Sequence, residues 1–302
     1  MPNQSKNIED LPEIFKKHLS SESKCADIVK WVGDLPPFPH IASQALNLVE
    51  QPDTTANKLS ALLGKDTALA ARVLKIANSA MYARQREITT INQAIMLIGF
   101  QTLKGIIIAA TLKQFSRSPS KIEQLIWENS TSTAIAGRLL CKQLKCNVAD
   151  EIFILSLLHD LGKLVLVKQA ADQYKTVIEM VEGGKDFVSA EEEVLGFNHA
   201  VIGAMVLKKW SFPAETWETV LFHHNLAELN EDSPILEKTR ILNAADLVAH
   251  SAGYGHPEGF PDCKEQTLLA LKELGLNSDD LENLIAEVQE KFETEGSSFA
   301  NA

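Results

Sequence analysis

Apolar residues recur at helical spacing along nearly the whole chain. In the segment 67–77, Leu69, Val73 and Ile76 fall on one helix face, and Asp66 stands at the position of an N-cap. Almost no segment shows the strict alternation of apolar and polar residues that is typical of a half-buried strand. The pattern therefore predicts an all-α, multi-helix fold.

Capping residues predict where several helices begin and end. Thr90 followed by Gln93 has the form of a capping box, and Gly99 is predicted to end that helix in a left-handed conformation. Another helix should run from about residue 101 to 114. Because polar residues interrupt the apolar stretch 94–112, we expect two amphipathic helices there and no membrane span.

The second half of the chain follows the same helical pattern. Helices are predicted at about residues 121–144, 150–167, 171–182, 199–210, 214–226 and 235–250, with two more before a polar tail. The segment 116–120 is polar and contains proline, and it separates two long helical regions. It predicts a boundary near residue 118.

Composition narrows the choice of partners. The 302-residue chain has a net charge of −11, which disfavours binding to nucleic acid or to an anionic membrane. Residues 1–6 lack the charged-then-apolar pattern of a signal peptide, so we expect a cytoplasmic protein. The four cysteines show no CxxC spacing and are expected to be reduced.

Histidine and aspartate side chains interrupt several apolar segments. The adjacent pair His159 and Asp160 is followed by others in separate segments, namely His199, His223, His224 and Asp246. Imidazole and carboxylate groups that converge from several helices can hold one or two transition metal ions. The same side chains could instead hydrogen-bond one another and hold the helices in register, since buried polar groups need partners. The other histidines are expected at the surface or in loops, namely His18, His40, His250 and His256.

Two sets of residues resemble a known family. The motif Leu-Pro-Pro-Phe-Pro at 35–39 and the segments 72–82 and 91–99 resemble the HDOD domain, the HD-related output domain of bacterial signalling. The order His-Asp, His, His-His, Asp in the second half resembles the wider HD superfamily of metal-dependent phosphohydrolases. The resemblance implies an N-terminal helical subdomain packed on a degenerate HD-type helical core. The implied parts are an extension at 1–24, the N-terminal helical part at 25–118, the HD-like subdomain at 119–292 and a flexible tail at 293–302.

The resemblance also implies roles for individual residues. His159 and Asp160 match the paired motif, and Asp246 matches the terminal aspartate. Asn129 stands where the family has its first histidine, and asparagine is a poor ligand for a transition metal. Lys163 matches the lysine that follows the pair and could stabilise charge on a reacting phosphoryl group.

A second ion position is better preserved than the first. In the two-metal branch of the superfamily, the second ion is held by four groups that match Asp160, His199, His223 and His224. Three imidazoles and one carboxylate suit a single divalent ion of iron, zinc or manganese.

The resemblance implies a signal-transduction protein that regulates by binding a signalling protein or a small ligand, with weak or no catalysis. The alternative is a metal-dependent phosphohydrolase that acts on a nucleotide or another phosphoester. The alternative depends on Asn129, because a two-metal mechanism needs both ions and asparagine weakens the first position.

Overall fold

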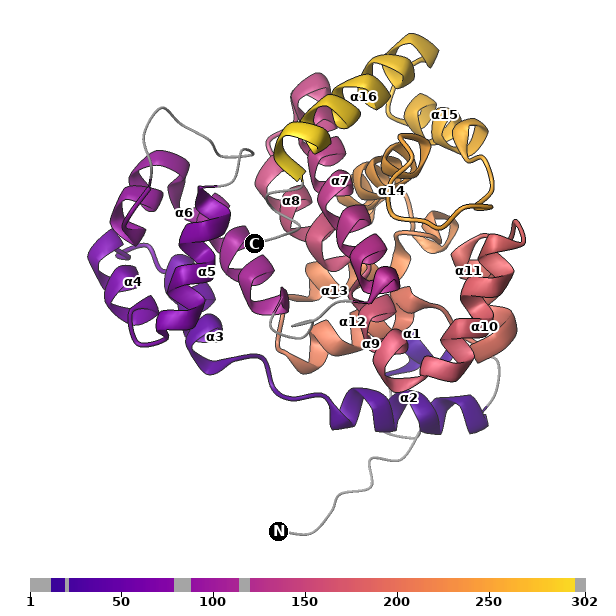
Figure 1. Ribbon diagram of the computed structural model, residues 1–302, viewed down its shortest axis with the longest axis horizontal. Coiled ribbons are helices and arrows are strands. Elements are labelled where there is room, and N and C mark those ends of the chain that lie inside the picture. The colour runs from indigo at the N-terminus through magenta and orange to yellow at the C-terminus, as the bar shows by residue number, and fades with distance from the viewer. Residues whose placement is uncertain (1–11, 20–21, 79–87, 114–119, 297–302) are drawn as a thin grey trace.

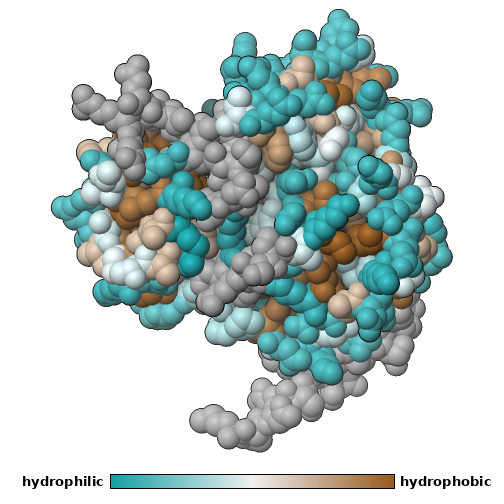
Figure 2. Space-filling model, in the orientation of Figure 1, coloured by the Kyte–Doolittle hydropathy of each residue, from teal (hydrophilic) through white to brown (hydrophobic). Residues whose placement is uncertain are grey.

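The computed structural model describes residues 12–19, 22–78, 88–113 and 120–296, and these residues form helices and turns with no strand among them (Figure 1). The predicted all-α fold is confirmed. Hydrophilic side chains cover much of the face in Figure 2, with hydrophobic areas between them.

The first part of the chain contributes helices to two places. Its helices are α1 (Glu13–Lys16), α2 (Glu22–Asp34), α3 (His40–Val49), α4 (Ala56–Leu63), α5 (Thr67–Ala77) and α6 (Ile91–Leu112). Helices α3 to α6 form a small lobe at one side of the molecule (Figure 1). Helices α1 and α2 lie against the large lobe instead, where Phe15 packs on Trp217 and Trp31 packs on Phe197.

The large lobe is built mainly from the later helices. These are α7 (Lys121–Leu144), α8 (Ala149–Leu158), α9 (Leu161–Gln169), α10 (Ala171–Glu182), α11 (Phe187–Leu195), α12 (His199–Lys209), α13 (Ala214–Phe222), η4 (Leu226–Glu228), α14 (Leu236–Ser251), α15 (Lys264–Glu273), α16 (Ser278–Lys291) and η5 (Phe292–Gly296). Helix α7 packs on both α8 and α14, and α12 packs on both α9 and α13. These helices enclose the predicted ligands.

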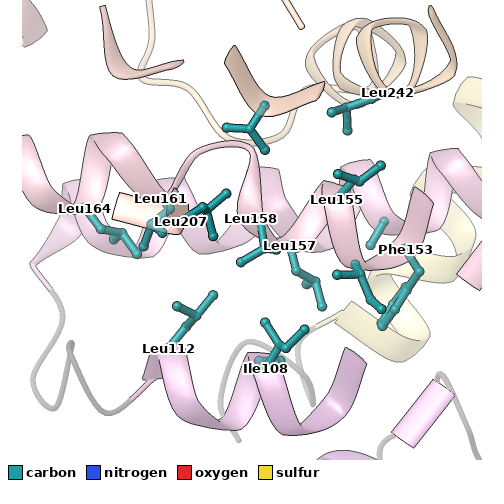
Figure 3. Packing of buried hydrophobic residues seen from close by; sticks show 14 of the residues in the cluster. Ile108, Leu112, Phe153, Leu155, Leu157, Leu158, Leu161, Leu164, Leu207 and Leu242 are labelled. Atoms are coloured by element: carbon teal, nitrogen blue, oxygen red, sulfur yellow. The ribbon is translucent and has the colours of Figure 1, made fainter. Parts of the chain in front are cut away.

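Helix α6 joins the two lobes. It packs with α3, α4 and α5 of the small lobe and with α8 of the large lobe. Figure 3 shows Ile108 and Leu112 of α6 facing Leu157 and Leu158, and all four are buried. The two lobes therefore share a continuous hydrophobic core.

The predicted N-terminal caps are confirmed. Asp66 accepts a hydrogen bond from the backbone N–H of Leu69 at 2.9 Å, and Thr90 and Gln93 form a capping box. Gly99 breaks the helical path of α6 where a helix end is predicted. Its angles, φ 79° and ψ 171°, differ from the predicted left-handed helical conformation and lie in a region that is nearly exclusive to glycine. Among the described residues, α6 alone has the length and apolar composition to cross a membrane, and 56% of its most apolar window is buried.

The predicted helix at 150–167 is wrong in one respect. Helix α8 ends at Leu158 and α9 begins at Leu161, so His159 and Asp160 lie in a turn between two helices. The turn bends the chain and directs both side chains into the lobe. Helix α11 was not predicted.

The predicted division into 1–24, 25–118, 119–292 and 293–302 stays a prediction. Its boundary near residue 118 lies outside the described residues, as do residues 1–6. The expected cytoplasmic location also stays a prediction. Cys141, Cys146 and Cys263 are free thiols, as expected.

Candidate metal centre

All the predicted ligands lie close together inside the large lobe. Asn129 is on α7, His159 and Asp160 are in the turn between α8 and α9, His199 is the first residue of α12, His223 and His224 follow α13, and Asp246 is on α14. His224 is partly exposed, and the others are buried. The fold therefore brings together side chains that are far apart in the sequence.

The first group surrounds the Asn129 amide. His159 Nε2 lies 3.2 Å from Asp246 Oδ1 and 3.6 Å from Asp160 Oδ2. Asn129 Nδ2 lies 2.8 Å from Asp246 Oδ1, 3.0 Å from Asp160 Oδ2 and 3.2 Å from His159 Nε2. An amide N–H donates hydrogen bonds and offers no lone pair to a metal ion. At the position of a missing ligand, Asn129 therefore acts as a hydrogen-bond donor.

The second group consists of three histidines. His199, His223 and His224 offer ring nitrogens that all lie within 4.8 Å of one another, and the set His159, Asp160 and His223 meets the same limit. His199 Nε2 is 3.0 Å from His224 Nε2 and 3.2 Å from Asp160 Oδ1. Because His223 belongs to both sets, the two groups adjoin.

Three of the buried histidine rings, those of His159, His199 and His223, are each held through the Nδ1 atom. His159 and His223 donate from Nδ1 to the backbone carbonyl three residues earlier, at 2.7 and 2.6 Å. His199 donates from Nδ1 to Glu191 Oε2 at 2.6 Å. When the ring is neutral, these hydrogen bonds select the tautomer in which Nε2 carries the lone pair, and that tautomer can bind a metal.

Electrostatics differ between the two groups. Burial, together with the nearby His159 and His199, lowers the pKa of His223 to about 3, so this ring is neutral at pH 7. Burial alone would also lower the pKa of His159, but the Asp160 and Asp246 carboxylates outweigh burial and raise it. His223 is thus the better prepared of the two as a neutral ligand.

Lys163 is the cation of the cluster. Its Nζ atom donates to Asp160 Oδ2 at 2.9 Å and lies 4.2 Å from the centre of the Phe187 ring. Burial alone would lower the pKa of Lys163, but Asp160 and Asp246 outweigh burial and raise it. The side chain is therefore positively charged and is held against a candidate ligand. Its predicted part in stabilising a reacting phosphoryl group stays a prediction.

The donor set fits a divalent cation. Three buried carboxyl groups, those of Asp160, Asp246 and Glu191, lie near enough to the buried Lys163 ammonium group to interact with its charge. Asp160 Oδ1 and His223 Nε2 are buried and have no hydrogen-bond partner, although such atoms nearly always have one. One ion held by Asp160, His199, His223 and His224 would satisfy both atoms and reduce the excess of acidic groups.

Three residues of the site were not predicted. Glu191 and Tyr174 are fully buried behind His199 and are joined by a 2.9 Å hydrogen bond. His250, predicted as a surface or loop residue, is buried with Nε2 3.6 Å from Asp246 Oδ1, so that prediction is wrong. The spacing of four residues from Asp246 was the available signal, because it places both side chains on one face of a helix. Glu191 gave no comparable signal.

A loop closes the Asn129 side of the cluster. Gly255 has φ +81°, and a Cβ atom there would lie 2.2 Å from Asn129 Cβ. Only glycine fits such a close approach at a positive φ. His256 in the same loop stacks on Phe260 with ring centres 4.5 Å apart.

A helical fold that gathers His-Asp, His, His-His and Asp side chains in this order is typical of an HD-type protein. The HDOD domain family matches residues 35–226, which is more than half of the chain. The chain belongs to the HDOD family.

Solved structures share this fold. A protein from Shewanella amazonensis SB2B, named "Putative phosphohydrolase", is 26% identical with a TM-score of 0.70, and the match covers 91% of this chain and 97% of that chain. An HDOD domain protein of unknown function from Geobacter sulfurreducens is 20% identical with a TM-score of 0.72, and the match covers 92% and 97% of the two chains.

A curated relative is longer than this chain. An uncharacterized protein of Treponema pallidum (strain Nichols) is 24% identical over 237 residues, which is 77% of this chain and 46% of the relative. The chain thus spans about half the length of the curated relative that it matches.

Proposed function

We propose that this HDOD protein is a signal-transduction module that binds one divalent transition metal ion and regulates through binding, with little or no turnover. Asp160, His199, His223 and His224 hold the ion in this proposal, and His159 and Asp246 support them. Its partner is a signalling protein or a small ligand.

Asn129 is the observation that carries the proposal. Its amide nitrogen lies within 3.2 Å of Asp246, Asp160 and His159, where a ligand of a first ion would stand. The side chains that would bind a first ion, those of Asp246, Asp160 and His159, are thereby already in contact with Asn129 and with one another. Since hydrolysis assisted by two metals needs both ions to hold the attacking and leaving oxygens, one ion supports binding better than turnover.

Burial supports the same proposal. Five of the six candidate ligands are at most 2% exposed, and only His224 has appreciable contact with solvent. A substrate would have to approach the ion past His224, whereas a metal ion needs far less space.

Metal content tests the proposal. The protein is purified without chelators, and iron, zinc and manganese are measured in wild type, His223→Ala, Asp160→Asn and the control His40→Ala, which removes an exposed histidine of α3. We expect about one equivalent in wild type and the control, with nearly all of it lost in the two site variants. No metal in wild type after reconstitution would refute the proposal.

Phosphohydrolase activity is the second candidate. It is favoured by Lys163, whose Nζ lies 2.9 Å from Asp160 Oδ2 beside the proposed ion. Metal-loaded wild type, Asn129→His and His223→Ala are assayed with p-nitrophenyl phosphate and its bis-ester. Hydrolysis in wild type that rises in Asn129→His and disappears in His223→Ala would establish this candidate and contradict regulation without turnover.

A further inference from the structure

Glu191 on α11 is a carboxylate placed deep in the large lobe. Its side chain is 0% exposed, and both oxygens accept hydrogen bonds. Oε2 accepts from the His199 ring Nδ1 at 2.6 Å and from the His199 backbone N–H at 2.7 Å. Oε1 accepts from the Tyr174 hydroxyl at 2.9 Å. With three donors directed at it, Glu191 is oriented away from the metal position and toward His199.

This arrangement sets His199 apart from the other buried histidines. His159 and His223 are each backed by a neutral backbone carbonyl, whereas His199 is backed by a carboxylate. An anionic acceptor at Nδ1 makes Nε2 a stronger electron donor than a carbonyl does, and such partners fix the ring orientation of metal-binding histidines.

We propose that Glu191, held by Tyr174, is the positioning residue that makes His199 the anchoring ligand of a divalent transition metal ion. The ion then lies on the side of His199, His223 and His224, away from Asn129. This inference rests on the proposed metal site and deepens it, because it states which side of the cluster the ion occupies and what determines that side.

A purely structural role for Glu191 must be separated from this one. His199 is the first residue of α12, and a carboxylate that accepts its backbone N–H also stabilises the start of that helix. A structural role would lower the stability of the metal-free protein and leave the metal affinity of the folded protein unchanged. A positioning role lowers that affinity.

Cobalt(II) is the probe for the test, since its visible absorption reports imidazole ligation. The full chain is stripped of metal and titrated with Co²⁺ as wild type, Glu191→Gln and Glu193→Gln. Glu193 is an exposed residue of the same helix that pairs with Lys185, so it is the matched control. Thermal unfolding of each metal-free protein is measured in parallel.

We expect Glu191→Gln to bind Co²⁺ about 10- to 100-fold more weakly than wild type with an altered absorption spectrum, and Glu193→Gln to behave as wild type. Equal affinity and an equal spectrum in Glu191→Gln would overturn the inference and leave the metal site standing. No Co²⁺ binding by wild type would overturn the metal site, and the inference with it.

A second measurement, made on wild type with His199→Gln used only to assign the resonance, applies if Glu191→Gln fails to fold. Nitrogen-15 NMR of the histidine rings reports which nitrogen bears the proton. The inference requires the His199 resonance, identified by its loss in His199→Gln, to show a proton on Nδ1 and a Co²⁺ or Zn²⁺ effect on Nε2. A proton on Nε2 in both the free and the metal-loaded protein would overturn it.

Discussion

At the scale of single residues, the Asn129 amide determines how the acidic groups of the cluster are satisfied. The Asp160 and Asp246 carboxylates are buried at 1% and 2% exposure, and both accept from Asn129 Nδ2. Asp160 has Lys163 as a second donor, and Asp246 has His159 and His250 nearby. Asn129 thus connects two carboxylates that would otherwise repel each other.

Asn129→Leu tests this role in the metal-free protein. Leucine has a similar shape but no N–H groups, so two buried carboxylates each lose a donor. We expect the free energy of unfolding, measured by urea denaturation with chelator present, to fall by about 1–3 kcal/mol.

Ser130→Ala is the control for that measurement. It removes a hydroxyl that bonds only a carbonyl of its own helix, and we expect a smaller loss. An Asn129→Leu variant as stable as wild type would show that the amide does not hold the carboxylates.

The sequence predicts those residues of the cluster whose side chains are unusual in an apolar segment. His159, Asp160, His199, His223 and Asp246 stand out in this way, and the fold buries all five. Glu191 could not be predicted, because it lies in a run of three glutamates whose other two members are exposed. Only the path of α11 distinguishes it from its neighbours.

At the scale of elements, local sequence signals predicted the starts of several helices and the break at Gly99, whereas the break at His159 was not predicted. Thr90 and Gln93 form their capping box from sequence-local contacts. The break at His159 has no capping side chain, since Asp160 caps α9 without a side-chain hydrogen bond. The buried polar side chains that meet at this turn come from helices distant in the sequence, and a periodic apolar pattern does not record such contacts.

The end of α2 depends on a lysine from another helix. Lys209 of α12 donates from Nζ to the backbone carbonyls of Val32, Gly33 and Leu35 at 2.7, 2.9 and 2.7 Å. Carbonyls in the last turn of a helix lack partners within that helix. We expect Lys209→Met to lower the free energy of unfolding by about 1–2 kcal/mol, because charge-assisted hydrogen bonds are lost at a partly exposed site.

The neighbouring lysine provides the control. Lys208 Nζ lies 4.4 Å from the centre of the Trp217 ring, a contact worth about 0.5–1 kcal/mol at an exposed site. In urea denaturation, Lys208→Met should therefore cost less than Lys209→Met. The reverse order would contradict the capping role of Lys209.

At the scale of the whole molecule, buried neutral histidines couple the fold to pH. Burial and the nearby His159 and His199 lower the pKa of His223 to about 3, and burial lowers the pKa of His250 to about 4 against the opposing effect of Asp246. In the unfolded chain both rings take up protons near pH 6.5. Between pH 6.5 and the lowered pKa values of the native state, the unfolded state binds more protons than the native state. Stability therefore falls as pH falls through this range.

The size of this effect follows from counting protons. Between about pH 5.5 and 4.5 His223 and His250 are protonated only in the unfolded state. The same holds for His224, because burial and the nearby His223 and His199 hold its pKa well below the usual range. The metal-free protein should therefore lose about 4 kcal/mol of stability per pH unit from these three histidines. His159, whose pKa is raised, carries its proton in both states over this range and adds nothing. We expect urea denaturation with chelator present to show this slope.

His250→Phe retains the stacking on Phe260 and removes one titrating ring, so its slope should be shallower by about 1.4 kcal/mol per pH unit. Equal slopes in the two proteins would mean that His250 is protonated in the native state and that the cluster tolerates a further charge.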